Sequence, residues 1–463
     1  MPKEKETNDD LVTQSTHKNA PNLRERRSQV LKDQHRIVLF KGDIMYMADD
    51  GIYHHLTSDQ FARLAYQVAP MSHTMVRDLE KFTRGTAKDC THMAKYIAFG
   101  EWVWDMDKAD FTTSVPVEDC IYCTPIQPSE TALEAVNQFL LEVANNDPGV
   151  RSDILQSIAP LFTTVKPAGV IWWQGSGSNS KSATMHLITA ILRPYLASVT
   201  LKQLEDERDT PVLNGKLGNI VGESSEGMIE DSRTYKAIGT HDDFMVHKFN
   251  SQDQVVISGN LHHIFSTNNM PIFGDKSNGA RRRTLIIKFQ NRFKDDPLFE
   301  AKTFTPDFIA GFLHLCLEAA KELKANRYQY KFSEATQHVK AEYDDVVNTA
   351  ETFAQYLVDM GVQYFSNFSK LRMAYEWWCD SNSYTALGKT HLRNAILSAN
   401  FKRSSMRNID DKIVQIFLLE GATTENTKEL FMGVYTSADA DVKVKLNSEE
   451  EEKAKQTILS KDW

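Results

Sequence analysis

Apolar residues follow two different spacings along this 463-residue chain, and the changes between them predict where its folded parts lie. Residues 1 to about 30 are polar and lack apolar periodicity, so we expect a mobile tail there. From Ile37 onward, short apolar and aromatic runs broken by Gly and Asp predict small β-hairpins, in IVLFKGDIMYMADDGIYHHL and YIAFGEWVWDMDKADF. Helical spacing follows in TALEAVNQFLLEVANN and DILQSIAPLF.

The middle of the chain, from residue 168 to about 325, alternates apolar strands with helices, which is typical of a parallel α/β core. The expected strands are Gly169 to Trp173, Asn219 to Gly222, Leu261 to Thr267 and Thr284 to Phe289. The helical stretch DFIAGFLHLCLEAAKELKAN and a polar linker then lead to a last small unit. In that unit, GKTHLRNAILSANFKRSSMRNIDDKIVQIFLL predicts a helix, a basic turn and an apolar strand, which resembles a winged helix.

The predicted organisation is therefore an α/β protein with several parts. We expect a tail over residues 1–30, an N-terminal helical and β accessory domain over 31–165, a parallel α/β core over 166–330, a winged-helix-like domain over 345–422 and a charged tail over 423–463.

Composition places the chain among ordinary globular proteins, with 41% hydrophobic and 25% charged residues. No signal peptide or membrane span is evident, so we expect a cytoplasmic protein. The five cysteines are an odd number scattered over a long chain, which favours free thiols. Cys90, His92, Cys120 and Cys123 could form a zinc site, but the two halves are far apart in sequence and free thiols are the favoured interpretation.

The net charge of −9 argues against a protein that coats nucleic acid non-specifically, because such binding needs an excess of Lys and Arg. It leaves room for a local DNA channel, in which a basic inner surface lies inside an acidic exterior.

The segment VIWWQGSGSNSKSATMHLITAIL carries the strongest functional signal, because it reads as a buried strand, a Gly/Ser loop and a helix that opens with Lys and Ser. Lys181 would reach the β and γ phosphates of ATP, and the Ser182 hydroxyl would ligate Mg²⁺. Ser180 departs from the common pattern, since Gly is usual at that position. The expected nucleotide-binding residues are Gly175, Ser176, Gly177, Ser178, Asn179, Ser180, Lys181 and Ser182.

Three later motifs, two at the ends of strands and one before a strand, add catalytic candidates. KLGNIVGESSEG ends an apolar strand in carboxylates, of which Glu223 is the first choice and Glu226 the second for a place beside Mg²⁺ and the attacking water. In LHHIFSTNNMPIF, an apolar strand ends in Thr267 and Asn268; the Asn268 amide either holds the water or senses the γ-phosphate, or the residue simply forms a turn. In SNGARRRTLIIKF, Arg282 or Arg283 can act as an arginine finger, or the run is a solvated basic turn.

The order of these motifs resembles the phage and plasmid primase/helicase group of superfamily 3, AAA+ ATPases related to the poxvirus-type helicases. The resemblance covers roughly residues 35 to 420. It implies that Lys181 and Ser182 belong to Walker A, Glu223 to Walker B and Asn268 to sensor 1, with Arg282 or Arg283 acting on a neighbouring subunit. A primase activity is not expected, because few residues precede the loop.

The resemblance also implies a DNA-gripping hairpin near His247 and Lys248, followed by the turn NSQDQ. Lys236 and Asp242 match the family's intermediate motif, but Thr240 and His241 stand where two glycines are usual. In the winged-helix-like unit, the residues that would face DNA phosphates are Lys389, Arg393, Lys402, Arg403 and Arg407.

The leading hypothesis is a hexameric, ATP- and Mg²⁺-dependent helicase that moves 3′ to 5′ on DNA during replication of a phage, plasmid or mobile element. A primase or polymerase could be supplied by another chain. Two alternatives stay open: a P-loop kinase with a small acceptor, and a DNA-binding initiator whose ATPase has decayed.

Overall fold

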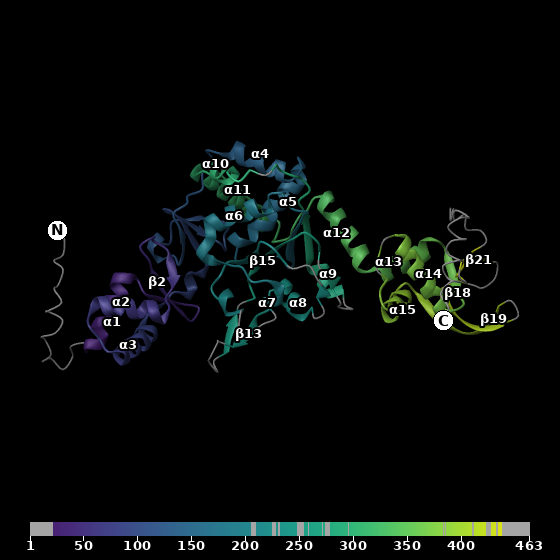
Figure 1. Cartoon of the computed structure of the whole chain (residues 1–463), viewed down its shortest axis with the longest axis horizontal. Coiled ribbons are helices and arrows are strands. Elements are labelled where there is room, and N and C mark those ends of the chain that lie inside the picture. The colour runs from purple at the N-terminus through teal and green to yellow at the C-terminus, as the bar shows by residue number, and fades with distance from the viewer. Residues whose placement is uncertain are drawn as a thin grey trace. The chain divides into compact units, whose positions relative to one another are not determined.

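The computed structural model describes residues 22–204, 210–224, 228–229, 232–247, 254–257, 259–270, 272–273, 278–294, 296–382, 384, 386–409, 412–422, 427–431 and 434–437. The chain forms two compact units, Met1–Gln337 and His338–Trp463 (Figure 1). Among the described residues, no helix combines the length and apolar character that a membrane crossing requires.

The first unit opens with a helix where a tail was expected. Helix α1 spans Leu23–His35, and Asn22 and Glu25 cap its start reciprocally. The helix buries Leu31, and its Ser28 hydroxyl accepts a hydrogen bond from Thr83 at 3.0 Å. The predicted tail is therefore wrong from Leu23 onward, because a capping box and a few buried contacts hold a helix of low apolar content.

Two small mixed sheets follow, built from antiparallel hairpins as the sequence patterns predict, with one parallel strand pair in each. The first sheet has the order β3-β2-β1-β4 and the second the order β7-β6-β5-β8. The elements of this part are α1 (Leu23–His35), β1 (Val38–Phe40), β2 (Asp43–Met47), β3 (Tyr53–His55), α2 (Ser58–Val68), α3 (His73–Thr86), β4 (Lys88–Asp89), β5 (Tyr96–Phe99), β6 (Trp102–Asp105), β7 (Asp110–Thr112), β8 (Tyr122–Thr124), α4 (Leu133–Val143) and α5 (Pro148–Ile158).

A parallel sheet of order β10-β11-β15-β9-β17 forms the centre of the unit. It confirms the four predicted strands to within a residue or two at their ends. The elements are β9 (Val170–Gln174), α6 (Lys181–Leu192), β10 (Leu196–Ala197), α7 (Leu201–Leu204), β11 (Gly218–Val221), β12 (Met228–Ile229), α8 (Arg233–Thr240), β13 (Phe244–His247), β14 (Gln254–Ile257), β15 (His262–Thr267), β16 (Ile272–Phe273), α9 (Asn278–Arg283), β17 (Thr284–Lys288), α10 (Phe299–Thr303) and α11 (Pro306–Ala325).

One large hydrophobic cluster extends from Val38 to Leu323, and a smaller cluster lies among α1, α2 and α3. Helices α4, α5 and α11 gather on one side of the central sheet (Figure 1) and contact one another. Trp173 on β9 donates to the Ser157 hydroxyl of α5 at 3.1 Å, and Trp104 on β6 donates to the Phe162 carbonyl at 2.8 Å. The boundary expected near residue 165 therefore does not separate two cores.

The second unit has its own core, with helices on a sheet of order β19-β20-β18-β22-β21. Two of these strands, β21 and β22, lie in the predicted charged tail, which is therefore wrong up to residue 437. The elements of the second unit are α12 (Glu334–Val347, which begins in the first unit), α13 (Thr349–Asp359), β18 (Val362–Phe365), α14 (Phe368–Ser381), α15 (Lys389–Ser398), β19 (Phe401–Ile409), β20 (Lys412–Leu419), β21 (Thr427–Phe431) and β22 (Val434–Ser437).

Candidate functional site

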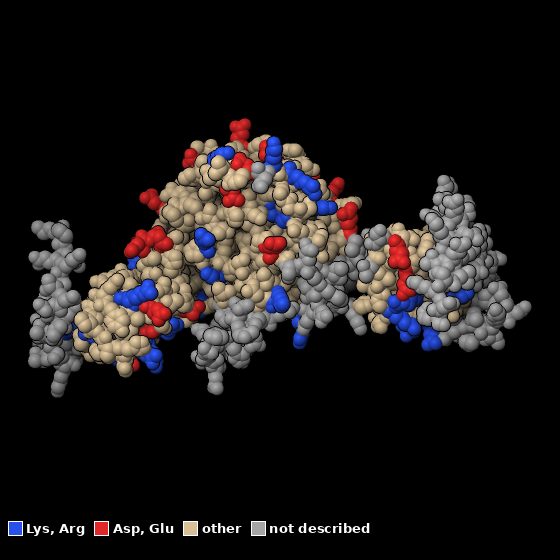
Figure 2. Space-filling view, in the orientation of Figure 1, with Lys and Arg blue, Asp and Glu red and all other residues tan. Residues whose placement is uncertain are grey.

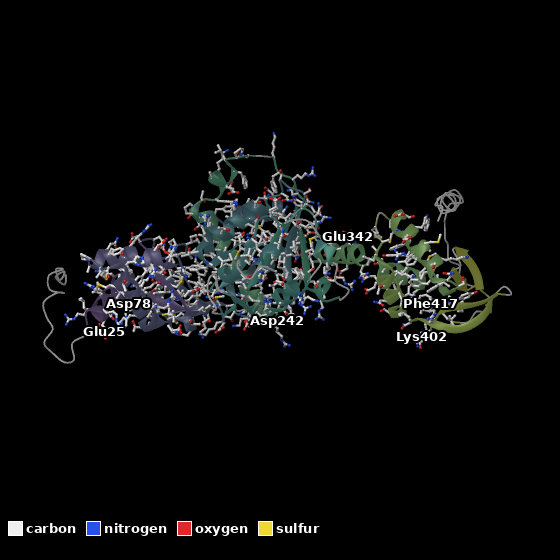
Figure 3. The ribbon with its side chains drawn as sticks, turned by 60° about the horizontal axis from the view of Figure 1, so that its bottom comes forward. Glu25, Asp78, Asp242, Glu342, Lys402 and Phe417 are labelled. Carbon is white, nitrogen blue, oxygen red and sulfur yellow. The ribbon has the colours of Figure 1, made fainter. Side chains whose placement is uncertain are left out.

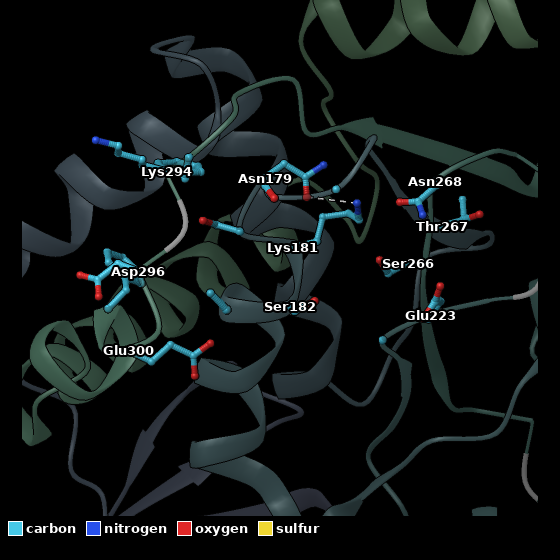
Figure 4. Close-up of a pocket in the computed structure, with 17 residues that line it drawn as sticks. Asn179, Lys181, Ser182, Glu223, Ser266, Thr267, Asn268, Lys294, Asp296 and Glu300 are labelled. Atoms are coloured by element: carbon cyan, nitrogen blue, oxygen red, sulfur yellow. Dashed lines mark hydrogen bonds between the residues drawn. The ribbon is translucent and has the colours of Figure 1, made fainter.

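A cavity of about 650 Å³ opens at the carboxyl ends of the central strands (Figure 4). Its walls come from the β9–α6 loop, from the ends of β11 and β15, and from the segment before α10. The lining residues are Gly177, Ser178, Asn179, Ser180, Lys181, Ser182, Ala183, Gly222, Glu223, Ser266, Thr267, Asn268, Phe293, Lys294, Asp296, Phe299 and Glu300.

The β9–α6 loop curls tightly because several of its residues adopt conformations that suit glycine. A Cβ on Gly175 would lie 2.0 Å from Asn179 Nδ2 and 2.6 Å from the Phe289 carbonyl oxygen, so only glycine fits there. Gly177 has φ +90°. Ser178 (φ 45°) and Ser180 (φ 63°, ψ 15°) also lie in the left-handed region. The position where Ser replaces the usual Gly is therefore one that does call for glycine-like backbone geometry.

Lys181 opens helix α6 and is held inside the loop, with only 6% of its surface exposed. Its Nζ donates to the Gly175 carbonyl at 2.6 Å. It also donates to Asn179 Oδ1 at 3.1 Å (Figure 4). Burial lowers the pKa of Lys181, and the Glu223 carboxylate acts in the opposite direction. A phosphate at the start of α6 would offer the Lys181 ammonium charged oxygen acceptors in place of these neutral ones.

Glu223 and Asn268 face this lysine from two neighbouring strands (Figure 4). Strand β15 lies between β9 and β11, and the Gly175 N–H donates to the Thr267 carbonyl at 3.1 Å. The three predicted motifs therefore meet at one edge, because the carboxyl ends of parallel strands lie together. Glu226, the second choice for the carboxylate, lies outside the described residues.

The opposite wall of the cavity was not predicted. It carries Phe293, Lys294, Asp296, Phe299 and Glu300. Glu300 contacts His186 of α6, with 2.9 Å between Oε1 and Nδ1. These residues follow β17 in a polar and aromatic segment that matches no motif. Only their place directly after a core strand could have drawn attention to them.

The two candidate arginines lie at the other edge of the sheet. They end α9, directly before Thr284, which is level with Val170 at the amino end of β9. The guanidinium of Arg283 donates to the Gly279 carbonyl at 2.7 Å, and its side chain packs near Gly239. Arg282 is exposed. Neither arginine lines the cavity, and Arg282 is the more exposed of the two.

A β-hairpin stands where the family resemblance implies one. Strands β13 and β14 pair antiparallel, with His247 level with Gln254 (Figure 1). The side chain of His247 and all of Lys248 lie outside the described residues. At the hairpin base, Asp243 accepts from the Gly259 N–H at 2.7 Å.

The departure at Thr240 and His241 leaves a regular helix end. His241 adopts φ 59° and ψ 34°, and its N–H donates to α8 carbonyls as a left-handed C-cap. The Thr240 hydroxyl donates to Asp242 Oδ2 at 2.6 Å. The position of Asp242 is marked in Figure 3. Histidine therefore occupies a second position at which glycine would be less strained.

In the described part of the second unit, basic side chains gather at the lower end of the visible face, over α15, and acidic side chains lie directly above them (Figure 2). Lys402 and Arg403 are exposed, and Figure 3 shows Lys402 pointing outward. Lys402 pairs with Glu420 at 2.5 Å, and Arg393 lies 5.2 Å from the centre of the Phe368 ring. The side chain of Arg407 is outside the described residues.

The candidate zinc ligands do not converge among the described residues, which hold no group of three metal-binding side chains. The thiol of Cys120 donates to the Pro116 carbonyl at 3.8 Å, and that of Cys123 to the Gly51 carbonyl at 3.2 Å. Each thiol therefore has a backbone partner of its own.

Comparison with known proteins finds likeness of fold alone. No protein-family model matches the chain, and no curated protein matches it. The apo structure of the NrS-1 C-terminal region (305–718) has a TM-score of 0.52 at 13% identity, and the match covers 86% of this chain and 100% of that one. The A-form apo structure of that region has a TM-score of 0.51 at 13% identity, with coverage of 85% and 98%. The shared architecture therefore extends over most of both chains.

Proposed function

We propose that this protein hydrolyses ATP in the large cavity and uses the energy to move DNA as a ring-forming helicase of the superfamily 3 type. One observation carries the proposal: three adjacent strands bring the Gly/Ser loop, a carboxylate and an amide to the same wall of the cavity. A phosphate-binding loop alone would suit many enzymes, whereas this trio suits nucleotide hydrolysis.

The residues fit ATP and Mg²⁺. The loop N–H groups and the start of α6 favour phosphate oxygens, and Lys181 is bonded to the loop and feels the charge of Glu223. Ser182 and Glu223 supply the oxygen donors that Mg²⁺ prefers, and the ion would neutralise charge that develops on the phosphates.

In the hydrolysis step, Glu223 orients the attacking water and takes up its proton, while Asn268 holds the water or the γ-phosphate from the neighbouring strand. Arg282 of an adjacent subunit supplies positive charge to the transition state, since it is exposed and remote from its own cavity. This arrangement requires an assembly, for which we propose a hexamer.

DNA contacts are proposed for the hairpin β13–β14, through His247 and Lys248, and for Arg393, Lys402 and Arg403 in the second unit. The order helix, strand, two helices and hairpin in α13 to β20 supports a winged-helix-like unit. We further propose action in the cytoplasm of a bacterial host, during replication of a phage, plasmid or mobile element, with a primase or polymerase on another chain.

ATP turnover measured with and without single-stranded DNA tests this function. A DNA-stimulated ATPase supports the helicase. Turnover that depends on a small phosphate acceptor instead would indicate a P-loop kinase. DNA binding without ATP turnover would indicate an initiator with a decayed ATPase. The observation that favours this alternative is Ser180, which stands where glycine is usual.

A further inference from the structure

A second cavity, of about 220 Å³, lies on the side of the central sheet away from the nucleotide loop. Lys166 comes from the segment before β9, Lys216 from the segment before β11, and Asn260 from the segment before β15. All three segments lead into the amino ends of parallel strands. The lining residues are Lys41, Thr91, His92, Ala94, Lys95, Met106, Tyr122, Thr163, Thr164, Lys166, Lys216, Leu217 and Asn260.

The cavity collects positive charge without a matching carboxylate. Four of its described lining residues are lysines and none is acidic. Lys95 is neutralised by Asp107 at 3.2 Å, outside the lining. Lys166 donates to the Pro160 and Thr163 carbonyls, and Lys216 donates to the Pro194 carbonyl at 2.6 Å. Within the described residues, Lys41, Lys166 and Lys216 therefore have no acidic partner.

This arrangement is costly for a protein with no ligand. An ammonium group that leaves water needs an opposite charge or full hydrogen bonding. Burial, and secondarily the charge of Lys41, lowers the pKa of Lys166 to about 7. Burial also lowers the pKa values of Lys41 and Lys216. An anion in the cavity would stabilise the charged form of all three side chains.

Hydrogen bonds between distant segments hold the lysines in place. The Asn214 amide donates to the Lys41 carbonyl at 2.9 Å and to Asp43 Oδ2 at 2.8 Å. The Tyr122 hydroxyl donates to the Gly215 carbonyl at 3.0 Å. The β1–β2 turn and the segment that carries Lys216 are thereby fixed to each other, so the charges converge before any ligand arrives.

The cavity adjoins the base of the hairpin β13–β14. Asn260, three residues after β14, lines the cavity and donates to the Thr164 carbonyl at 2.6 Å. Both hairpin strands also contact the turn Thr210–Leu213, which leads to Lys216. The cavity is smaller than the roughly 300 Å³ at which whole small-molecule sites begin, which favours a single phosphate group over a complete nucleotide.

We propose that this lysine cavity binds one backbone phosphate of a DNA strand that passes the hairpin. The proposal rests on the proposed function and adds a contact point to it. The site recognises a phosphodiester by charge, so the contact is independent of base sequence.

Binding of a labelled oligothymidine to the full-length protein, with Mg²⁺ and a non-hydrolysable ATP analogue, tests the proposal across a series of salt concentrations. The test variant is Lys41→Gln with Lys216→Gln. The control is Lys321→Gln, which removes an exposed lysine that pairs with Glu318 at 2.8 Å. We expect the double variant to bind about tenfold more weakly, the lower range for a charge-assisted hydrogen bond. Its salt slope should fall by about 0.7, the value for one phosphate of a single strand.

Thermal melting and DNA-free ATP turnover check that the variant folds and keeps its nucleotide site. If the double variant misfolds, Lys41→Gln alone serves, because Thr91 and Asn214 bind the backbone of that residue. Unchanged affinity and salt slope in a folded variant overturn the proposal. A second result also overturns it: inorganic phosphate raises the melting temperature of the wild type but not of the double variant, while the two proteins bind DNA equally well. The site then binds a free anion.

The proposed function fails by a different result. A wild type that hydrolyses no ATP contradicts the motor, whereas weaker oligothymidine binding by the double variant still supports the phosphate site. A wild type that binds no oligothymidine overturns the phosphate site.

Discussion

Ser180→Gly is expected to stabilise the protein slightly and to keep or raise its ATP turnover. In the left-handed region, a residue with a Cβ costs about 1–2 kcal/mol relative to glycine. Glycine also gives the unfolded chain more conformational entropy, which offsets about 0.4–1 kcal/mol of that difference. The net gain in the free energy of unfolding is therefore about 0–1.6 kcal/mol, with a midpoint of about 0.8 kcal/mol, which corresponds to a rise in melting temperature on the order of 1 °C in a unit of this size.

Turnover should survive because no described contact depends on the Ser180 side chain. The residue makes no side-chain cap, and Thr184 bonds to its carbonyl oxygen, once through the N–H and once through the hydroxyl, each at 2.9 Å. Both contacts remain in the glycine variant.

Steady-state ATP hydrolysis and differential scanning fluorimetry measure the two effects. Ser180→Ala is the matched control, because it removes the hydroxyl and keeps the strained backbone, so it should resemble the wild type in both assays. A large loss of turnover in both variants would refute the reasoning and give the hydroxyl a part in catalysis. A loss of stability in the glycine variant alone would refute the strain estimate.

Other perturbations test the site and the core. Lys181→Ala should lower ATP turnover by at least about a hundredfold while the melting temperature is kept, since the ammonium bonds to neutral acceptors in the free protein; wild-type turnover would contradict the nucleotide site. Arg282→Ala should bind a fluorescent ATP analogue but not hydrolyse ATP, and mixing it with Lys181→Ala should restore some turnover; mixed assemblies without recovery would contradict action between subunits. Gly175→Ala should reduce both nucleotide binding and stability, because its Cβ would overlap Asn179 and a backbone oxygen; unchanged melting would show that the loop can open. The pKa of Lys166 is about 7 in the folded protein, below its value in the unfolded chain. Between these two pKa values the unfolded chain binds more protons, so the free energy of unfolding should rise with pH above 7. Urea titrations of Lys166→Met should show a smaller rise, and an equal dependence on pH in the two proteins would contradict the burial argument.

The sequence pattern predicted the central sheet well, because buried parallel strands are continuous apolar runs that can be recognised one at a time. It also predicted which side chains would share an edge, since Glu223 and Asn268 each follow such a run. What it could not supply was backbone conformation. The left-handed backbone conformation of Ser180 and His241 explains why glycine is usual at both positions. The residue type at neither position predicts that conformation.

Longer-range features were also missed. Strand β21 lies in a stretch rich in polar residues, and its pairing with β22 places it in a sheet. Helix α1 depends on its cap and on contacts with α3, which local apolar spacing does not report. The continuous core of the first unit joins residues more than a hundred positions apart, so no local change in composition marks it.

Strand β11 gives the first unit a connection of fixed length between its two cavities. The strand is fully buried and hydrogen-bonded to β10 on one side and β15 on the other, so it resists bending and stretching. Lys216 lies two residues before it and Glu223 two residues after it. Its four residues span about 13 Å. In the proposed function, a movement of β11 along its axis when a bound nucleotide changes state would displace Glu223 and Lys216 by the same amount, so that a chemical event at one edge of the sheet would become a mechanical step at the other.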